Sequence, residues 1–124
     1  MMTRTTLSIL GIVALSLGAC KQSTPEPKLG PHRGDEVPIE VPYPPPPARV
    51  EIIPKPPGDL KGPVWIDGEW QWRSRRWVWQ AGRWEVPLSG GYYAPAATVR
   101  LSDGTLVFFK GTWKTTSPPR PPSP

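Results

Sequence analysis

The chain has 124 residues and a formal net charge of +5, so it has room for one folded domain at most. Its single cysteine and single histidine exclude an internal disulfide and a metal site built from several nitrogen and sulfur ligands. The positive charge is small and scattered, without a run of five or six like charges, which argues against nucleic acid as a partner. Composition therefore predicts no metal and no cofactor.

Residues 1–19 have the three parts of a secretory signal peptide: a basic start with Arg4, an apolar run from Leu7 to Leu17, and small residues before a cleavage site. The apolar run is shorter than the roughly 20 residues that a membrane-spanning helix needs. We therefore expect a signal helix that is removed during export.

The end of this segment, Leu17-Gly18-Ala19-Cys20, resembles the lipobox of bacterial lipoproteins. The resemblance implies that the thiol of Cys20 carries a diacylglycerol group and that the chain is cleaved just before it. The alternative is an ordinary signal peptide followed by a chance cysteine. Lys21 resembles an outer-membrane sorting signal by the rule known for enterobacterial lipoproteins. Membrane lipid is thus the expected partner, and the cell envelope, most simply the outer membrane, the expected location.

The acylated Cys20 opens a proline-rich segment, residues 20–62, that includes four consecutive prolines from Pro44 to Pro47. Proline cannot donate a backbone hydrogen bond, and the segment has little apolar surface to offset the entropy of ordering. We expect a disordered tether that reaches on the order of 130 Å at ~3.1 Å per residue. A proline-motif ligand for an adaptor domain is the alternative. The tail, residues 117–124, is expected to be disordered as well.

All seven tryptophans lie between Trp65 and Trp113, where the pattern aromatic-x-x-Gly-x-Trp occurs three times. The three copies are Trp65-Ile-Asp-Gly68-Glu-Trp70, Trp79-Gln-Ala-Gly82-Arg-Trp84 and Phe108-Phe-Lys-Gly111-Thr-Trp113. This pattern resembles the YXWGXW (WXXGXW) repeat family, which includes many bacterial lipoproteins and has no settled biochemical activity. The proline-rich stretch from Pro44 to Glu51 also resembles the lead-in of that family.

Two-residue hairpin turns explain the spacing without reference to a family. Turns at Asp67-Gly68, Ala81-Gly82 and Lys110-Gly111 would pair the two aromatic residues of each copy across adjacent strands. A further turn at Ser74-Arg75 would pair Trp72 with Trp77. Six tryptophans then share one face of the sheet, and polar residues from Glu69 to Glu85 form a wet face opposite. The candidate face, as core or binding surface, comprises Trp65, Trp70, Trp72, Trp77, Trp79, Trp84, Phe108 and Trp113.

A shift of 29 residues superimposes much of this pattern on the second half of the domain. Trp79, Gly82 and Trp84 fall on Phe108, Gly111 and Trp113, and Trp70 and Trp72 on Val99 and Leu101. The Ser74-Arg75 turn falls on Asp103-Gly104, another strong hairpin signal. The predicted fold is all-β: a small antiparallel meander of about seven or eight short strands over residues 63–116, derived from a 29-residue duplication.

Two functions remain open for this domain. Rows of tryptophan suit the apolar faces of sugars, which favours a peptidoglycan- or glycan-binding module. A chain this short also needs its aromatic face as a core, which favours a structural or interaction domain with an envelope protein as partner. The cluster Arg73, Arg75 and Arg76 suits anionic groups or is simply a solvated turn. His32 is expected to be a solvated linker residue. The domain has no histidine to assist its few carboxylates in acid–base chemistry, so no enzyme is predicted.

Overall fold

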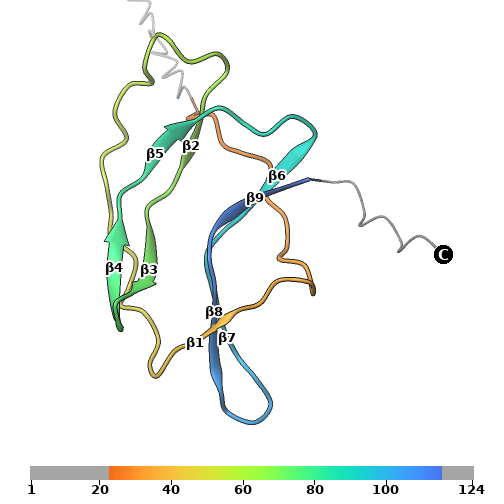
Figure 1. Ribbon diagram of the computed structural model, residues 1–124. Helices are drawn as coiled ribbons and strands as arrows, with labels where there is room; N and C mark the ends of the chain where they lie inside the picture. The colour runs from red at the N-terminus through yellow and green to blue at the C-terminus, as the bar shows by residue number, and fades with distance from the viewer. Residues whose placement is uncertain (1–22, 116–124) are drawn as a thin grey trace, which may run out of the picture.

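The computed structural model describes residues 23–115, and this part of the chain contains strands and no helix (Figure 1). Its strands are β1 Ile39–Glu40, β2 Val64–Ile66, β3 Glu69–Arg73, β4 Arg76–Gln80, β5 Arg83–Glu85, β6 Gly91–Ala94, β7 Ala97–Arg100, β8 Leu106–Phe109 and β9 Thr112–Thr115. Every strand pair is antiparallel, so the predicted all-β class is confirmed. A search of the same residues for an apolar helix long enough to cross a bilayer finds none. The predicted signal peptide, the lipobox with Cys20, and the tail 117–124 lie outside the described residues.

The first half of the domain is one long, interrupted hairpin in which β2 and β3 run against β5 and β4. The register pairs Trp65 with Trp84, Trp70 with Trp79, and Trp72 with Trp77. The turn predicted at Ser74-Arg75 is correct: both residues have positive φ, 49° and 62°, as a two-residue type I′ turn requires.

The turns predicted at the glycines of the repeats are wrong. At Asp67-Gly68 and Ala81-Gly82 the chain continues in the same direction instead of reversing, and neither glycine has a positive φ. Trp65 therefore pairs with Trp84 across the hairpin, and not with Trp70. The expected row of four tryptophans across four strands becomes a ladder of pairs along two arms, because nesting the four strands needs one reversal instead of three.

A second long hairpin repeats this arrangement, with β6 and β7 running against β9 and β8. Tyr93 pairs with Trp113, and Thr98 with Phe108. Lys110-Gly111, the third predicted turn, again lies in an interruption between two strands. The reversal is at Ser102–Gly104, where Leu101 N donates to Thr105 O at 2.8 Å and Gly104 has a φ of 88°.

This loop is one residue longer than the Ser74-Arg75 turn, so the two arms of the duplication have different offsets. Trp84 corresponds to Trp113 at an offset of 29 residues, but Trp65 corresponds to Tyr93 at an offset of 28. For the same reason the partner of Phe108 is Thr98, and not Val99 as the uniform shift predicted. Tyr93 is thus in step with the repeat once the longer loop is counted.

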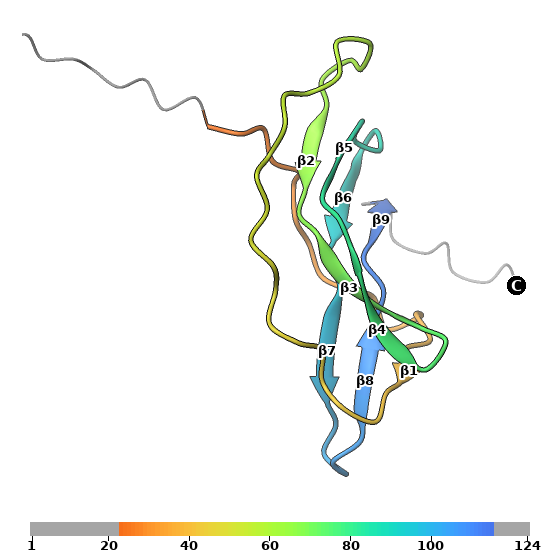
Figure 2. The ribbon, with the colours of Figure 1, turned by 90° about the vertical axis from the view of Figure 1, so that its left-hand side faces the viewer.

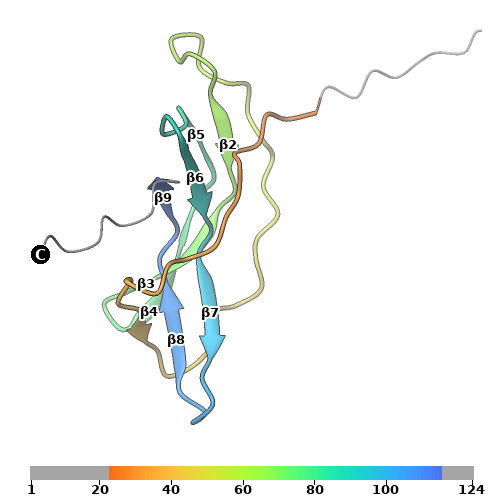
Figure 3. The ribbon, with the colours of Figure 1, turned by 90° about the vertical axis from the view of Figure 1, so that its right-hand side faces the viewer.

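Residues 23–62, predicted to be a free tether, are built into the fold. Backbone bonds attach the first part to both hairpins: Trp65 N donates to Pro25 O at 2.9 Å, and Tyr93 N donates to Lys28 O at 2.8 Å. This part runs between β2 and β6 in Figure 3. Farther on, β1 pairs with β8. The prediction failed because it counted only hydrogen bonds within the segment, whereas proline carbonyls still accept bonds from partners elsewhere.

Two clusters form the core where the hairpins meet. One joins Val64, Ile66 and Tyr93 with Trp113, and the other joins Val41, Leu106 and Phe108 with Trp72 and Trp77. The face predicted to be wet is covered in part, since Ile66 and Gln71 are only 2% and 7% exposed. Its carboxylates meet aromatic donors of the second hairpin, as Trp113 Nε1 donates to Glu85 at 2.8 Å.

Candidate functional site

The tryptophan ladder is built from cross-strand pairs in edge-to-face contact. Ring centroids are 5.4 Å apart in Trp65–Trp84, with an interplanar angle of 67°. The pairs Trp70–Trp79 and Trp72–Trp77 have nearly the same geometry, at 5.2 and 5.1 Å. This arrangement suits the ring quadrupole and is worth about 0.5–1.5 kcal/mol per pair beyond burial. The pairing therefore contributes directly to the stability of the hairpin.

The glycines of the repeat are required by close packing of indoles on the backbone. A Cβ on Gly68 would lie 2.3 Å from Cζ2 of Trp79, and a Cβ on Gly82 would lie 2.3 Å from Cζ2 of Trp65. The two copies thus lock reciprocally, because the first aromatic residue of each covers the glycine of the other. This contact accounts for glycine three residues after the leading tryptophan in both copies.

The third copy follows the same rule with a different partner. A Cβ on Gly111 would lie 2.5 Å from the hydroxyl oxygen of Tyr93, the residue that corresponds to Trp65. Phe108, the leading aromatic of this copy, is 4% exposed and lies 5.1 Å from the ring of Trp77. Trp113 pairs with Tyr93 at a centroid distance of 5.3 Å. These residues belong to the core.

A proline-rich strap, residues 43–54, lies along the tryptophan ladder (Figure 2). Indole N–H groups donate to its carbonyl oxygens at three places. Trp77 donates to Tyr43 at 3.1 Å, Trp70 to Pro47 at 3.1 Å, and Trp84 to Pro54 at 2.9 Å. Aromatic side chains that bond the exposed carbonyls of an extended proline-rich chain are a known mode of peptide recognition. Here, ligand and receptor belong to one chain.

Two charged side chains of the strap hold its middle in place. Glu51 accepts hydrogen bonds from Trp79 Nε1 at 2.5 Å and from Gly82 N at 3.0 Å. The guanidinium of Arg49 lies 5.0 Å from the ring centroid of Trp70, within range of a cation–π interaction. The repeat glycine therefore serves twice: its missing side chain admits Trp65, and its amide binds the strap.

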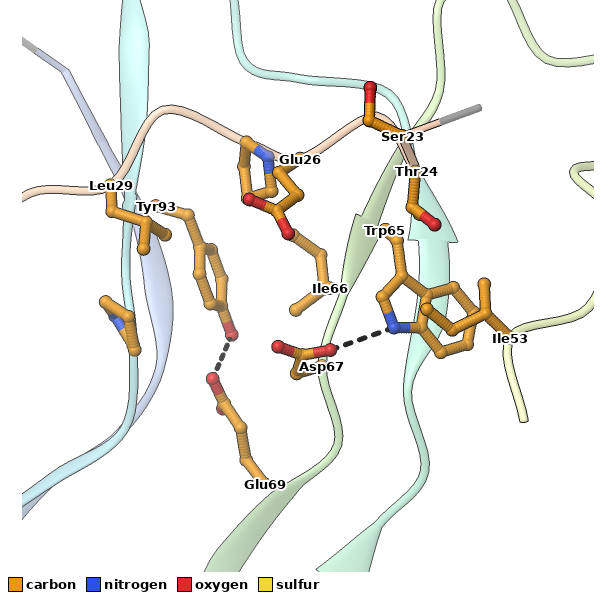
Figure 4. Close-up of a pocket in the computed structure, with 12 residues that line it drawn as sticks. Ser23, Thr24, Glu26, Leu29, Ile53, Trp65, Ile66, Asp67, Glu69 and Tyr93 are labelled. Atoms are coloured by element: carbon orange, nitrogen blue, oxygen red, sulfur yellow. Dashed lines mark hydrogen bonds between the residues drawn. The ribbon is translucent and has the colours of Figure 1, made fainter. Parts of the chain in front are cut away.

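A cavity of about 560 Å³ lies between the ladder and the N-terminal segment (Figure 4). Carboxylates of Glu26, Asp67 and Glu69 line it together with Trp65 and Tyr93. Trp65 Nε1 donates to Asp67 at 3.0 Å, and the Tyr93 hydroxyl donates to Glu69 at 3.0 Å. Both rings are almost fully buried, at 6% and 2% exposed, so neither offers an open face for stacking on a sugar.

Burial and the charge of Glu69 raise the pKa of Tyr93 to about 12. The phenol therefore stays protonated at neutral pH and keeps its bond to the carboxylate. Within residues 23–115, no group of three or more histidine, cysteine or acidic side chains could hold a metal ion. The cavity walls thus serve mainly to join the two hairpins.

His32 is fixed in the structure, contrary to the prediction of a solvated linker residue. Its side chain is 14% exposed, with Nδ1 2.7 Å from Glu36 and Nε2 2.6 Å from the carbonyl oxygen of Pro95. Glu36 also pairs with Lys114 of β9. Although burial raises the pKa of Glu36, the bonds from Lys114 and His32 outweigh it and lower that pKa overall. This group attaches the N-terminal segment to the second hairpin.

The arginine cluster lies at the tip of the first hairpin, exposed on all three residues. Arg73 and Arg76 face each other across the strands, and Arg73 donates to Gln71. No ion pair with a carboxylate is found for Arg73, Arg75 or Arg76 among the described residues. The arrangement is that of a solvated turn.

Comparison with protein-family models gives one match: residues 64–85 match the WXXGXW repeat in two copies. These are the copies that begin at Trp65 and Trp79, so the family resemblance is confirmed for them. The third copy lies outside the matched range. Comparison with curated proteins gives no match, and neither does comparison with solved structures.

Proposed function

Because residues 64–85 of this chain belong to the WXXGXW repeat family, we propose that it is a lipid-anchored protein of the bacterial cell envelope with a structural or interaction domain. The anchor is Cys20, with Leu17, Gly18 and Ala19 as the recognition sequence for its acylation. Membrane lipid is the first partner, and an envelope protein is the expected second. The outer membrane is the location that Lys21 favours.

One observation carries the structural role of the ladder: the chain's own strap covers it. Three indole N–H groups already bond strap carbonyls, and a fourth bonds Glu51. A sugar-binding platform needs exposed rings and free polar groups around them. Since the strap uses both, a glycan could bind there only after the strap had left. The family's repeat is thus a device for fastening a proline-rich segment to a β-hairpin.

The anchor is tested by growing cells that express the full-length precursor with an alkynyl fatty-acid analogue. Wild-type protein is expected to incorporate the analogue, and Cys20→Ala is expected not to. Ser23→Ala, beyond the lipobox, is the matched control and keeps the label. Labelling of the Cys20→Ala variant would contradict the lipoprotein assignment.

The glycan alternative is tested with the mature protein in mild detergent and purified cell-wall sacculi. We expect the protein to stay in the supernatant and its tryptophan emission to be blue-shifted already without ligand. Co-sedimentation of wild-type protein that is lost in Trp84→Phe, while Tyr43→Phe still pellets, would favour a peptidoglycan-binding module instead.

A further inference from the structure

The N-terminal segment is anchored to the fold almost from its first described residue. Pro25 O accepts a bond from Trp65 N, and residues 28–30 pair with Tyr93 in β6. Ser23 and Thr24 line the same cavity as Trp65 and Ile53. Little chain is therefore left as a free connection between the domain and Cys20, which under the proposed function carries the lipid.

Covalent geometry limits that connection. Between Cys20 and Ser23 an extended chain spans roughly 11 Å at most. This is far shorter than the tether that the proline content predicted, and comparable to the thickness of a headgroup layer. The short span means that the end of the domain near Ser23 must lie at the membrane surface.

That end of the domain is formed by two loops, residues 55–62 and residues 86–90. Both lie at the same end of the molecule as the start of the N-terminal segment in Figures 1 and 2. Val86 and Leu88 are 51% and 42% exposed, and Lys55 and Lys61 are exposed as well. Apolar side chains beside cations suit the boundary between headgroups and acyl chains, where lipid phosphates attract lysine.

The opposite end carries the hairpin turns. From Trp65 to Ser74 the first hairpin extends roughly 30 Å at ~3.3 Å per residue. The arginine cluster and the Ser102–Gly104 loop lie at this end in both views. A molecule held at its Ser23 end would direct both turns away from the lipid.

We propose that the surface formed by residues 55–62 and 86–90 rests on the membrane that holds Cys20, kept there by the short connection from Cys20 to Ser23. The partner of this surface is the lipid headgroup layer, and the β3–β4 and β7–β8 turns point outward. The inference rests on the proposed function, because it requires the lipid on Cys20.

The experiment uses full-length protein, processed in cells and reconstituted into vesicles of phosphatidylethanolamine and phosphatidylglycerol. Two matched variants, Ser89→Cys and Ser102→Cys, place a thiol fluorophore at opposite ends on exposed serines. Vesicles then receive lipids with a nitroxide on the headgroup. We expect quenching to be several-fold stronger at position 89 than at position 102. Equal quenching, or stronger quenching at position 102, would overturn the proposal.

A second variant tests whether the short connection sets the orientation. About 20 glycine and serine residues inserted before Ser23 add a mean reach of roughly 25 Å. The difference between positions 89 and 102 is expected to shrink, and an unchanged difference would contradict the role of the connection. Mass spectrometry of Cys20 separates the two proposals. Without lipid on Cys20, the proposed function fails; with lipid and equal quenching, only the orientation does.

Discussion

The hydroxyl of Tyr93 in β6 donates a hydrogen bond to Oε1 of Glu69 in β3 at 3.0 Å, which ties the second hairpin to the first. The same carboxylate oxygen accepts a bond from Ala96 N at 3.3 Å. Since this is a bond between buried and partly buried groups of different hairpins, the protonation of Tyr93 bears on the stability of the whole domain.

The first prediction concerns alkaline pH. The pKa of Tyr93 rises from 10.0 to about 12 on folding. Its stabilising contribution is therefore complete below pH 10 and is lost as pH rises through 12. Two pKa units correspond to about 2–3 kcal/mol. Urea titrations between pH 9 and pH 12 should show the free energy of unfolding of wild type approaching that of Tyr93→Phe. Tyr43→Phe, at a half-exposed tyrosine, should keep the wild-type slope.

The second prediction concerns the reciprocal lock between the repeats. Gly82→Ala would place a methyl group 2.3 Å from Cζ2 of Trp65, so the indole or the strand must move. Overpacking of this kind costs about 1–3 kcal/mol. Gly58→Ala is the matched control, because a Cβ there meets nothing within 4 Å. Thermal unfolding should show a clear loss of stability for Gly82→Ala alone. Equal melting temperatures for both variants would refute the lock.

The third prediction concerns the strap. Glu51→Gln removes the charge that accepts bonds from Trp79 Nε1 and Gly82 N. Hydrogen bonds to a charged group contribute about 1.5–3 kcal/mol, and we expect a loss of about 2 kcal/mol in urea unfolding. Limited proteolysis should also cut the variant faster within residues 43–54. Glu40→Gln, at an exposed position, should behave as wild type in both measurements.

The fourth prediction concerns the tip of the first hairpin. Arg75 has a φ of 62°, a conformation that costs a side chain about 1 kcal/mol or more. Arg75→Gly should therefore stabilise the protein, whereas Arg76→Gly in β4 should destabilise it by about 0.5–1 kcal/mol. The comparison of the two variants in urea unfolding removes the effect of losing one positive charge. Destabilisation by both substitutions would show that the arginine side chain at position 75 makes contacts of its own.

Sequence pattern predicted the all-β class, the turn at Ser74-Arg75 and the pairing of Trp72 with Trp77, because these depend on neighbours in the chain. It also predicted the family, since the spacing of Trp79, Gly82 and Trp84 is itself the motif. Its reading of the repeat glycines was wrong. Glycine before a strand suits a tight turn as well as a close approach to an indole, and local sequence does not distinguish them.

What only the tertiary structure decided is how segments distant in sequence meet. The strap binds to the ladder because residues about 30 positions apart, such as Pro54 and Trp84, supply the acceptor and the donor. A proline-rich segment considered alone lacks partners and should be disordered, so its order depends on a surface that exists only after the hairpin has formed. The composition of the chain determined which groups could bond, and the fold determined which of them do.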